Sequence, residues 1–291
     1  MTNEYEPPPQ IPITENLSTS AIWRRWLFGL WQQVQDSMVS SFDLEVSRGN
    51  ITGIKTVNKF GRCVDNVDAA DTDIWDGASG GTIIWVAPTE ARIHSIVSGS
   101  ASDDDNAGTG AYSVTVYGLT DWDTPEVSEV VLLAGLTPVN TVNSYVIIHR
   151  MVCAFGATST TANAGIITAT AATDATVTAQ IAVGEGQTQM AIYGIPSTQC
   201  FYMNDVYGGV NRAVSSACNL SILFNPSPNV SLTTFLIKST FPAHSTGETL
   251  SERIFKQPFK FAGPGILKIQ GNGTSPNLDV SAGFGGYLVT E

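Results

Sequence analysis

Aspartates form the densest group of side chains in this sequence that could do chemistry. One cluster occupies residues 65–76, and a second occupies residues 103–106 as Asp-Asp-Asp-Asn. Carboxylate oxygens on a flexible loop are the ligands that calcium prefers. The second cluster begins like a calcium-binding loop, but no glutamate closes it at the required distance, so it fails the EF-hand pattern. We expect a solvated turn at each cluster, and the alternative is a cation site formed by Asp65, Asp68, Asp71, Asp103 and Asp105.

Two tryptophans beside aspartates offer a second kind of site. Trp75 and Trp122 lie in or near expected loops, where exposed indole rings could form a platform for a sugar ligand. Burial in a β-sheet core is the commoner fate of such side chains. Two carboxylates facing each other across a cleft would suit a glycoside hydrolase, but the sequence identifies no such pair.

Other catalytic signatures are absent from the sequence. The three histidines, His94, His149 and His244, lack HExxH or HxH spacing, so nothing supports a zinc or iron site. No GxSxG nucleophile motif and no glycine-rich phosphate loop occurs. The four cysteines lack CxxC spacing and predict buried, reduced thiols. We therefore expect no catalytic residue, no metal, no cofactor and no enzymatic activity.

An amphipathic helix is expected over residues 17–38. Its apolar residues recur three or four positions apart, as on one face of a helix, while Arg24, Arg25 and several glutamines occupy the other side. A helix of this length is marginally stable alone in water, so something must cover its apolar face. The cover is its own β domain, a symmetry mate or a docking surface. The expected anchoring residues are Trp23, Trp26, Leu27, Leu30 and Trp31, with Arg24 and Arg25.

The rest of the chain has the patterns of an arm and of short strands. Residues 1–16 hold four prolines and predict an extended arm. From residue 40 onward the hydrophobic period changes from 3.6 to 2, as in Phe42, Leu44 and Val46, and many short β-branched runs follow. We expect a mostly β protein with two antiparallel β-sandwich-like units. An Ala- and Thr-rich stretch at 157–180 places their boundary, giving domains at 39–155 and 156–291.

Charge and targeting signals exclude several classes of partner. The chain has 291 residues, with 26 Asp and Glu against 14 Lys and Arg, and a formal net charge of −12. This balance disfavours nucleic acid and anionic membranes, which attract basic surfaces. The N-terminal segment has no basic region followed by an apolar one, and residues 21–31 are too short to span a bilayer. We expect a soluble protein that is synthesised in a cytoplasm and binds neither nucleic acid nor membranes.

Four short motifs carry a resemblance to a known group of proteins. They are RGNITG at 48–53, VNKFGR at 57–62, DIWDG at 73–77 and SAGF at 281–284. With these motifs the chain resembles structural proteins of tailed-bacteriophage virions over most of residues 42–291, with gaps. The motifs are not catalytic signatures, so the resemblance assigns no active-site residue.

The resemblance implies a place on a virus particle. It implies a capsid decoration or head-fibre subunit in the virion, attached through the arm and the helix. The implied partners are capsid or other virion proteins and further copies of the chain, with a homotrimer as the assembly that suits a capsid three-fold site or a fibre. The alternatives are a tail or fibre adaptor, a glycan-binding receptor module, a virion-borne glycan hydrolase and a major shell protein.

Overall fold

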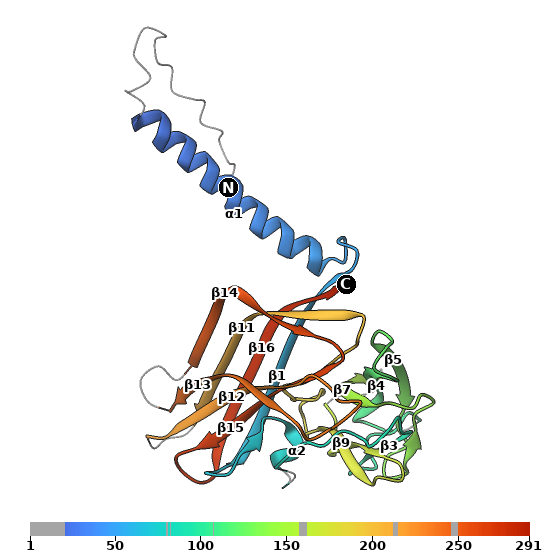
Figure 1. The fold of residues 1–291 in the computed structure, drawn as a ribbon. Helices are drawn as coiled ribbons and strands as arrows, with labels where there is room; N and C mark the ends of the chain where they lie inside the picture. The colour runs from blue at the N-terminus through green and yellow to red at the C-terminus, as the bar shows by residue number, and fades with distance from the viewer. Residues whose placement is uncertain are drawn as a thin grey trace. The chain divides into compact units, whose positions relative to one another are not determined.

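A computed structural model describes residues 21–79, 81, 83–106, 108–156, 162–211, 215–245 and 250–291. The expected arm at 1–16 lies outside these residues, as do residues 17–20 of the expected helix. The chain divides into two compact units, Met1–Lys55 and Thr56–Glu291. Helix α1 belongs to the first unit, and nearly all the strands belong to the second, which we call the β unit (Figure 1).

Helix α1 spans Ala21–Ser47 and is longer at its C-terminal end than the sequence predicted. It ends where Gly49 adopts a φ of +76°, a backbone conformation that favours glycine. The Gly49 N–H donates to the Val46 carbonyl and the Asn50 N–H donates to the Glu45 carbonyl, both at 2.9 Å. These two bonds form a Schellman cap that satisfies the last helical carbonyls.

The expected strand around Phe42, Leu44 and Val46 is therefore wrong. These residues are helical, and no glycine or proline stands between residue 30 and residue 48 to stop the helix earlier. Three alternating apolar residues are too short a pattern to overrule a helix that is already propagating. The predicted end at residue 38 moves accordingly to Ser47.

The remaining elements confirm a mostly β fold with antiparallel sheets. In chain order they are β1 (Ile54–Val67), β2 (Thr72–Asp73), α2 (Asp76–Ser79), β3 (His94–Ser98), β4 (Ala111–Leu119), β5 (Val127–Leu132), β6 (Val139–Asn140), β7 (Ile147–Phe155), β8 (Ile167–Ala171), β9 (Thr176–Ile181), β10 (Ile192–Ile195), β11 (Gln199–Asn211), β12 (Ala217–Asn225), β13 (Leu236–His244), β14 (Leu250–Ala262), β15 (Gly265–Gly273) and β16 (Leu278–Thr290).

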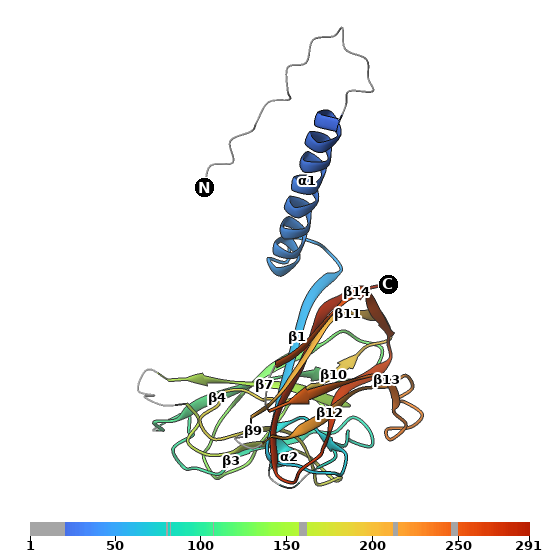
Figure 2. The ribbon, with the colours of Figure 1, turned by 90° about the vertical axis from the view of Figure 1, so that its left-hand side faces the viewer.

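These strands form four sheets among the described residues. The orders are β1-β16-β11-β14, then β10-β15-β12-β13 with β2 on β15, then β6-β3-β8-β9, and finally β5-β4-β7. An aromatic pair joins the first two sheets, since the rings of Phe224 in β12 and Phe261 in β14 lie 5.1 Å apart, centroid to centroid. Within the first sheet, Phe201 of β11 lies 5.7 Å from Phe284 of β16. In both views β3 and β9 lie at the same end of the β unit as α2 (Figures 1 and 2).

The strand pairing contradicts the predicted boundary between residues 155 and 156. Strand β3 pairs with β8 across that boundary, β2 pairs with β15, and β1 neighbours β16. The Ala- and Thr-rich stretch supplies strands β8 and β9, whose alanines Ala169, Ala171 and Ala179 are buried. Small side chains here mark close packing between strands, and residues of all four sheets share one hydrophobic core.

Two further features of the described residues bear on function. The four cysteines, Cys63, Cys153, Cys200 and Cys218, are free and buried. Burial raises the pKa of the Cys218 thiol to about 11, so it is not activated as a nucleophile. Among the described residues, neither helix combines the length and the apolar character that crossing a bilayer requires.

Candidate functional site

The candidate docking surface is one side of helix α1, which we call the α1 face. It comprises Trp26, Leu27, Phe28, Leu30, Trp31 and Val34. Phe28 is 58% exposed and Trp31 57% exposed, and their rings stack with centroids 6.0 Å apart. Leu27 and Val34 are also exposed, whereas Trp26 and Leu30 are partly buried. Of the other expected anchoring residues, Trp23, Arg24 and Arg25 lie in the helix, but their side chains are not among those described.

Phe28 is the member of the α1 face that the sequence analysis missed. It stands three residues before Trp31, a spacing at which helical side chains meet, and this was the available signal. The face presents carbon surface without an ionisable group, so it offers no acid, base or nucleophile. Burial of one such large side chain is worth about 1.5–3 kcal/mol. This arrangement is suited to protein association.

The first aspartate cluster holds the fold together. Asp73 is buried and pairs with Lys268 at 2.7 Å, and it accepts hydrogen bonds from the Trp85 N–H at 2.8 Å and the Gln270 amide at 3.1 Å. The Lys268 ammonium also lies 4.3 Å from the centre of the Phe235 ring. Every charge in this group is compensated locally, as burial requires.

The neighbouring aspartates fix loops in the same way. Asp68 accepts the Asn277 N–H at 2.6 Å, and Asp71 accepts the Asn272 amide at 3.2 Å. Asp76 is buried and accepts the Gln189 N–H at 3.0 Å, while burial raises the pKa of its carboxyl to about 7. Asp65 is exposed.

Asp103 in the second cluster is also a structural group, and a solvated turn is the wrong description of it. Its side chain is fully buried. One carboxylate oxygen accepts the N–H groups of Ala111 and Ala164, each at 2.8 Å. The other accepts the Ser98 hydroxyl at 2.5 Å and the Gly165 N–H at 2.9 Å. Asp103 thus joins three separate segments of the chain.

The alternative of a shared cation site is not supported. Four donors already occupy the Asp103 oxygens, and Asp104 accepts the Asn106 N–H at 2.9 Å. Among the described residues no group of three or more His, Cys, Asp or Glu side chains is arranged to hold a metal ion. The side chains of Asp65, Asp68, Asp71, Asp103 and Asp105 are therefore not gathered into a shared site.

For Trp75 the structure confirms the favoured expectation of burial and contradicts the alternative of a tryptophan platform. That side chain is fully buried, and a Cβ placed at Gly77 would meet its ring at 2.2 Å, so the indole fills the space that the glycine leaves. Trp122 is partly buried and packs against the hydrophobic core. These tryptophans pack into the protein because a large indole gains more free energy from burial than from partial exposure.

A buried polar cluster was not foreseen from the sequence. The ammonium of Lys59 donates to the His149 carbonyl, and His149 Nε2 lies 2.5 Å from a Glu126 carboxylate oxygen. The His149 ring packs on Tyr193 with centroids 4.6 Å apart. Burial, with a smaller contribution from the charge of Arg150, lowers the pKa of Lys59 to about 7. Lys59 and His149 are both buried, so neither can reach a reactant in solution.

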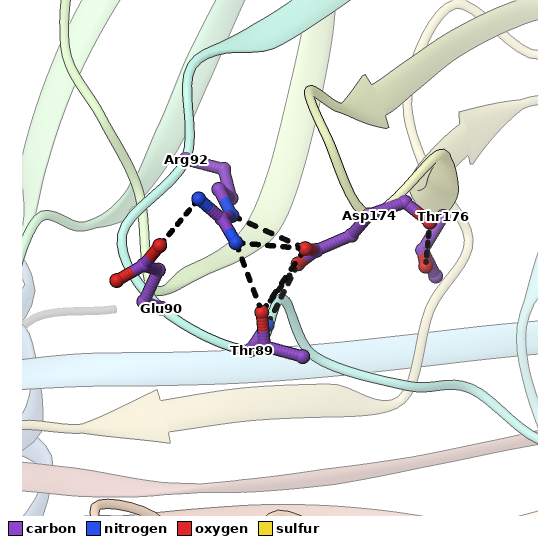
Figure 3. Close-up of polar contacts among 5 residues, drawn as sticks. All are labelled: Thr89, Glu90, Arg92, Asp174 and Thr176. Atoms are coloured by element: carbon purple, nitrogen blue, oxygen red, sulfur yellow. Dashed lines mark hydrogen bonds and ion pairs between the residues drawn. The ribbon is translucent and has the colours of Figure 1, made fainter.

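A second polar cluster fastens the turn between β8 and β9 (Figure 3). The Asp174 carboxylate accepts the Thr89 N–H at 2.8 Å and pairs with Arg92 at 3.1 Å. Arg92 also pairs with Glu90, and the Thr176 hydroxyl donates to the Asp174 carbonyl at 3.3 Å. The hydrogen bond from Thr89 holds the pKa of Asp174 below its usual range. This cluster joins the chain before β3 to the turn and leaves no group free for chemistry.

Comparison with known proteins identifies no relative. No protein-family model matches the chain, and no curated protein matches it.

Proposed function

We propose that this chain is a structural subunit of a bacteriophage virion, attached to the capsid through its N-terminal arm and helix α1 as a decoration or head-fibre subunit. The observation that carries the proposal is the exposed aromatic α1 face, with Phe28 and Trp31 more than half accessible in a unit distinct from the β unit. An apolar face of this kind on an acidic protein is suited to burial against another protein.

The first two motifs of the resemblance occupy positions that hold the fold. RGNITG at 48–53 contains Gly49, which caps helix α1, and Gly53, whose φ is +80°. KFGR at 59–62 contains Gly61, where a Cβ would lie 2.2 Å from the Ile74 carbonyl oxygen. Its arginine, Arg62, pairs with Asp279 at 2.7 Å. Each motif therefore has a structural reason for its residue types.

The other two motifs behave in the same way. DIWDG at 73–77 supplies the paired Asp73 and the buried Trp75 described above. SAGF at 281–284 lies in β16, where a Cβ at Gly283 would be 2.4 Å from the Tyr207 hydroxyl and Phe284 is buried in the core. A resemblance built on such residues supports a shared fold, and it assigns no catalytic residue.

The receptor-binding alternative has lost its main support. A glycan platform required Trp75 at the surface, and that side chain is fully buried. Attachment of the chain as a tail or fibre adaptor uses the same α1 face and differs only in the partner on the particle. In either case the proposed partners are virion proteins and further copies of this chain in a closed assembly such as a trimer.

Binding to particles tests the proposal directly. Phage particles assembled without this protein are mixed with the full chain, and the bound fraction is measured after sedimentation. We expect the wild-type chain to saturate its sites, and Leu27→Asp or Trp31→Asp to weaken binding at least about tenfold because each places a charge in a buried interface.

Val230→Asp is the matched control, because Val230 is 83% exposed and lies in the β unit. This variant should bind as the wild type does. Saturation of the particles by Leu27→Asp and Trp31→Asp would overturn attachment through the α1 face. Absence of the chain from purified virions by mass spectrometry would overturn the virion role itself.

A further inference from the structure

The segment that joins β4 to β5 is held at two points. We call residues 120–126 the β4–β5 segment. The Ser197 N–H donates to the Trp122 carbonyl within this segment at 2.6 Å. Farther along the segment, a Glu126 carboxylate oxygen lies 2.5 Å from His149 Nε2. The Glu126 side chain is 35% exposed and that of His149 is 2% exposed, so this second contact reaches from the surface to a buried ring.

A β-bulge in β7 places His149 at this contact. In the ladder with β4, the residues on either side of it, Ile148 and Arg150, face two neighbouring residues of β4, so His149 is the extra residue on β7. Its carbonyl accepts a hydrogen bond from the Lys59 ammonium of β1. Bulges commonly re-aim a side chain. Here the bulge brings β1, β7 and the β4–β5 segment together at one residue.

The hydrogen bond between His149 and Glu126 fits a neutral imidazole ring. A carboxylate accepts hydrogen bonds, so Nε2 carries the hydrogen and Nδ1 of the neutral ring carries a lone pair. His149 Nδ1 is buried and has no hydrogen-bond partner among the described residues. A proton added to Nδ1 would therefore become a buried donor without an acceptor, which is unfavourable.

A second base shares the same carboxylate. The Lys59 ammonium lies against the His149 carbonyl, and the charge of Glu126 acts on both side chains. Two other titratable groups face His149, namely Arg150 on the same strand and Tyr193 of β10, whose ring packs on it. Arg150 adds a positive charge, whereas burial raises the pKa of the Tyr193 hydroxyl and keeps it uncharged. Two buried bases thus face one carboxylate, which can neutralise one of them.

We propose that the contact between His149 and Glu126 is a proton-operated clasp, which holds the β4–β5 segment closed near neutral pH and releases it in acid. The closed cluster accommodates a charged Lys59 beside Glu126 but not a second buried cation. When His149 also takes up a proton, opening of the segment lets water solvate the surplus charge. This movement lies within the β unit, so it goes beyond the proposed function and does not depend on it.

The direction of the pH dependence follows from where the ring can take up a proton. Burial lowers the pKa of His149 in the closed state and outweighs the opposing effect of Glu126. In the open state water reaches the ring, and its pKa returns to the ordinary value of about 6.5. The open state then binds more protons, so the closed state loses stability relative to it as the pH falls below about 6.5. Burial lowers the pKa of Lys59 to about 7, so Lys59 is charged over the same range and opposes the second cation.

Hydrogen exchange of the Ser197 N–H tests the clasp, because this group is bonded to the β4–β5 segment itself. Its protection factor is measured by NMR on the full chain at a series of pH values. We expect protection to fall at least about tenfold between pH 7 and pH 5, since each pH unit below 6.5 favours the open state about tenfold. The amides of strand β12 should remain far better protected than Ser197 at pH 5, which separates local release from global unfolding.

Two variants separate the clasp from a merely structural contact. His149→Gln keeps an N–H donor for Glu126 but cannot take up a proton, so it should abolish the pH dependence at Ser197. Lys59→Met removes the competing cation and lets a protonated His149 pair with Glu126, so release should move to lower pH. His244→Gln is the matched control at an exposed histidine and should behave as wild type.

Three results would overturn the inference. They are constant Ser197 protection between pH 7 and pH 5 in the wild type, the same loss in His149→Gln as in the wild type, and release of Lys59→Met at higher pH than the wild type. Glu126→Gln provides a further test at a partly exposed position, where the fold should tolerate the change. It removes the charge that both bases share, so Ser197 should already be at least about tenfold less protected at pH 7, and wild-type protection there would also overturn the clasp.

Discussion

Replacing Asp103 with asparagine should destabilise the protein severely, although the change preserves size and shape. The carboxylate accepts two hydrogen bonds at each oxygen, and the side chain is fully buried. Asparagine replaces one oxygen with an NH₂ group, which presents hydrogens to two donors. Loss of two hydrogen bonds to a charged acceptor, at about 1.5–3 kcal/mol each, costs about 3–6 kcal/mol. For a domain of this size we expect the melting temperature to fall by on the order of 10 °C.

Asp105→Asn is the matched control, since it makes the same charge change two residues away on a partly exposed side chain. We expect its free energy of unfolding to stay within about 0.5 kcal/mol of wild type. Both variants are measured by thermal and urea unfolding, with calcium and with a chelator. Equal melting temperatures for Asp103→Asn and wild type would refute the structural role. A calcium-dependent rise in melting temperature that both variants abolish would instead restore the cation site.

Three further outcomes follow from buried groups. Burial lowers the pKa of His94 to about 4, below its unfolded value of about 6.5, so the unfolded chain binds the extra proton and stability falls as pH drops from 6.5 toward 4. At pH 5 the free energy of unfolding should be about 2 kcal/mol lower than at pH 7. Urea unfolding should show that His94→Asn loses less stability than wild type between these two pH values, whereas the exposed control His244→Asn loses as much as wild type. Trp75→Ala should cost about 3–5 kcal/mol by the same assay, and wild-type stability would contradict its burial. Lys268→Met leaves Asp73 without its cation and should lower the free energy of unfolding by about 3–5 kcal/mol. Adding Asp73→Asn to this variant should recover part of the loss. A Lys268→Met variant as stable as wild type would show that the ion pair is dispensable.

The aspartate clusters show what a local pattern can and cannot predict. The sequence identified Asp103 as unusual because three carboxylates stand in a row. Its donors come from Ser98, Ala111, Ala164 and Gly165, and the last two are about sixty residues away along the chain. Only the folded chain brings these N–H groups to one point. The row of carboxylates that suggests a cation site therefore contains one, Asp103, that instead accepts hydrogen bonds from backbone N–H groups.

The helix shows the opposite balance. Its amphipathic period is a local property, and the sequence was sufficient to place it and to identify Leu27 and Trp31 as surface candidates. Its C-terminal end is also encoded locally, in Gly49, whereas the alternation of Phe42, Leu44 and Val46 predicts a strand there. Phe28 lies beside the apolar stripe, so the period does not predict it, although its ring stacks on Trp31.

The sequence by itself determined the fold class, the amphipathic helix and the acidic character of this protein, because hydrophobic period and charge are properties of neighbouring residues. Only the tertiary structure decided which strands pair, since β3 with β8 and β2 with β15 are contacts between distant segments that depend on the whole core. It likewise decided that Trp75 is buried. The burial of a side chain and its neighbours in space depend on contacts between distant segments, so no short stretch of sequence determines them.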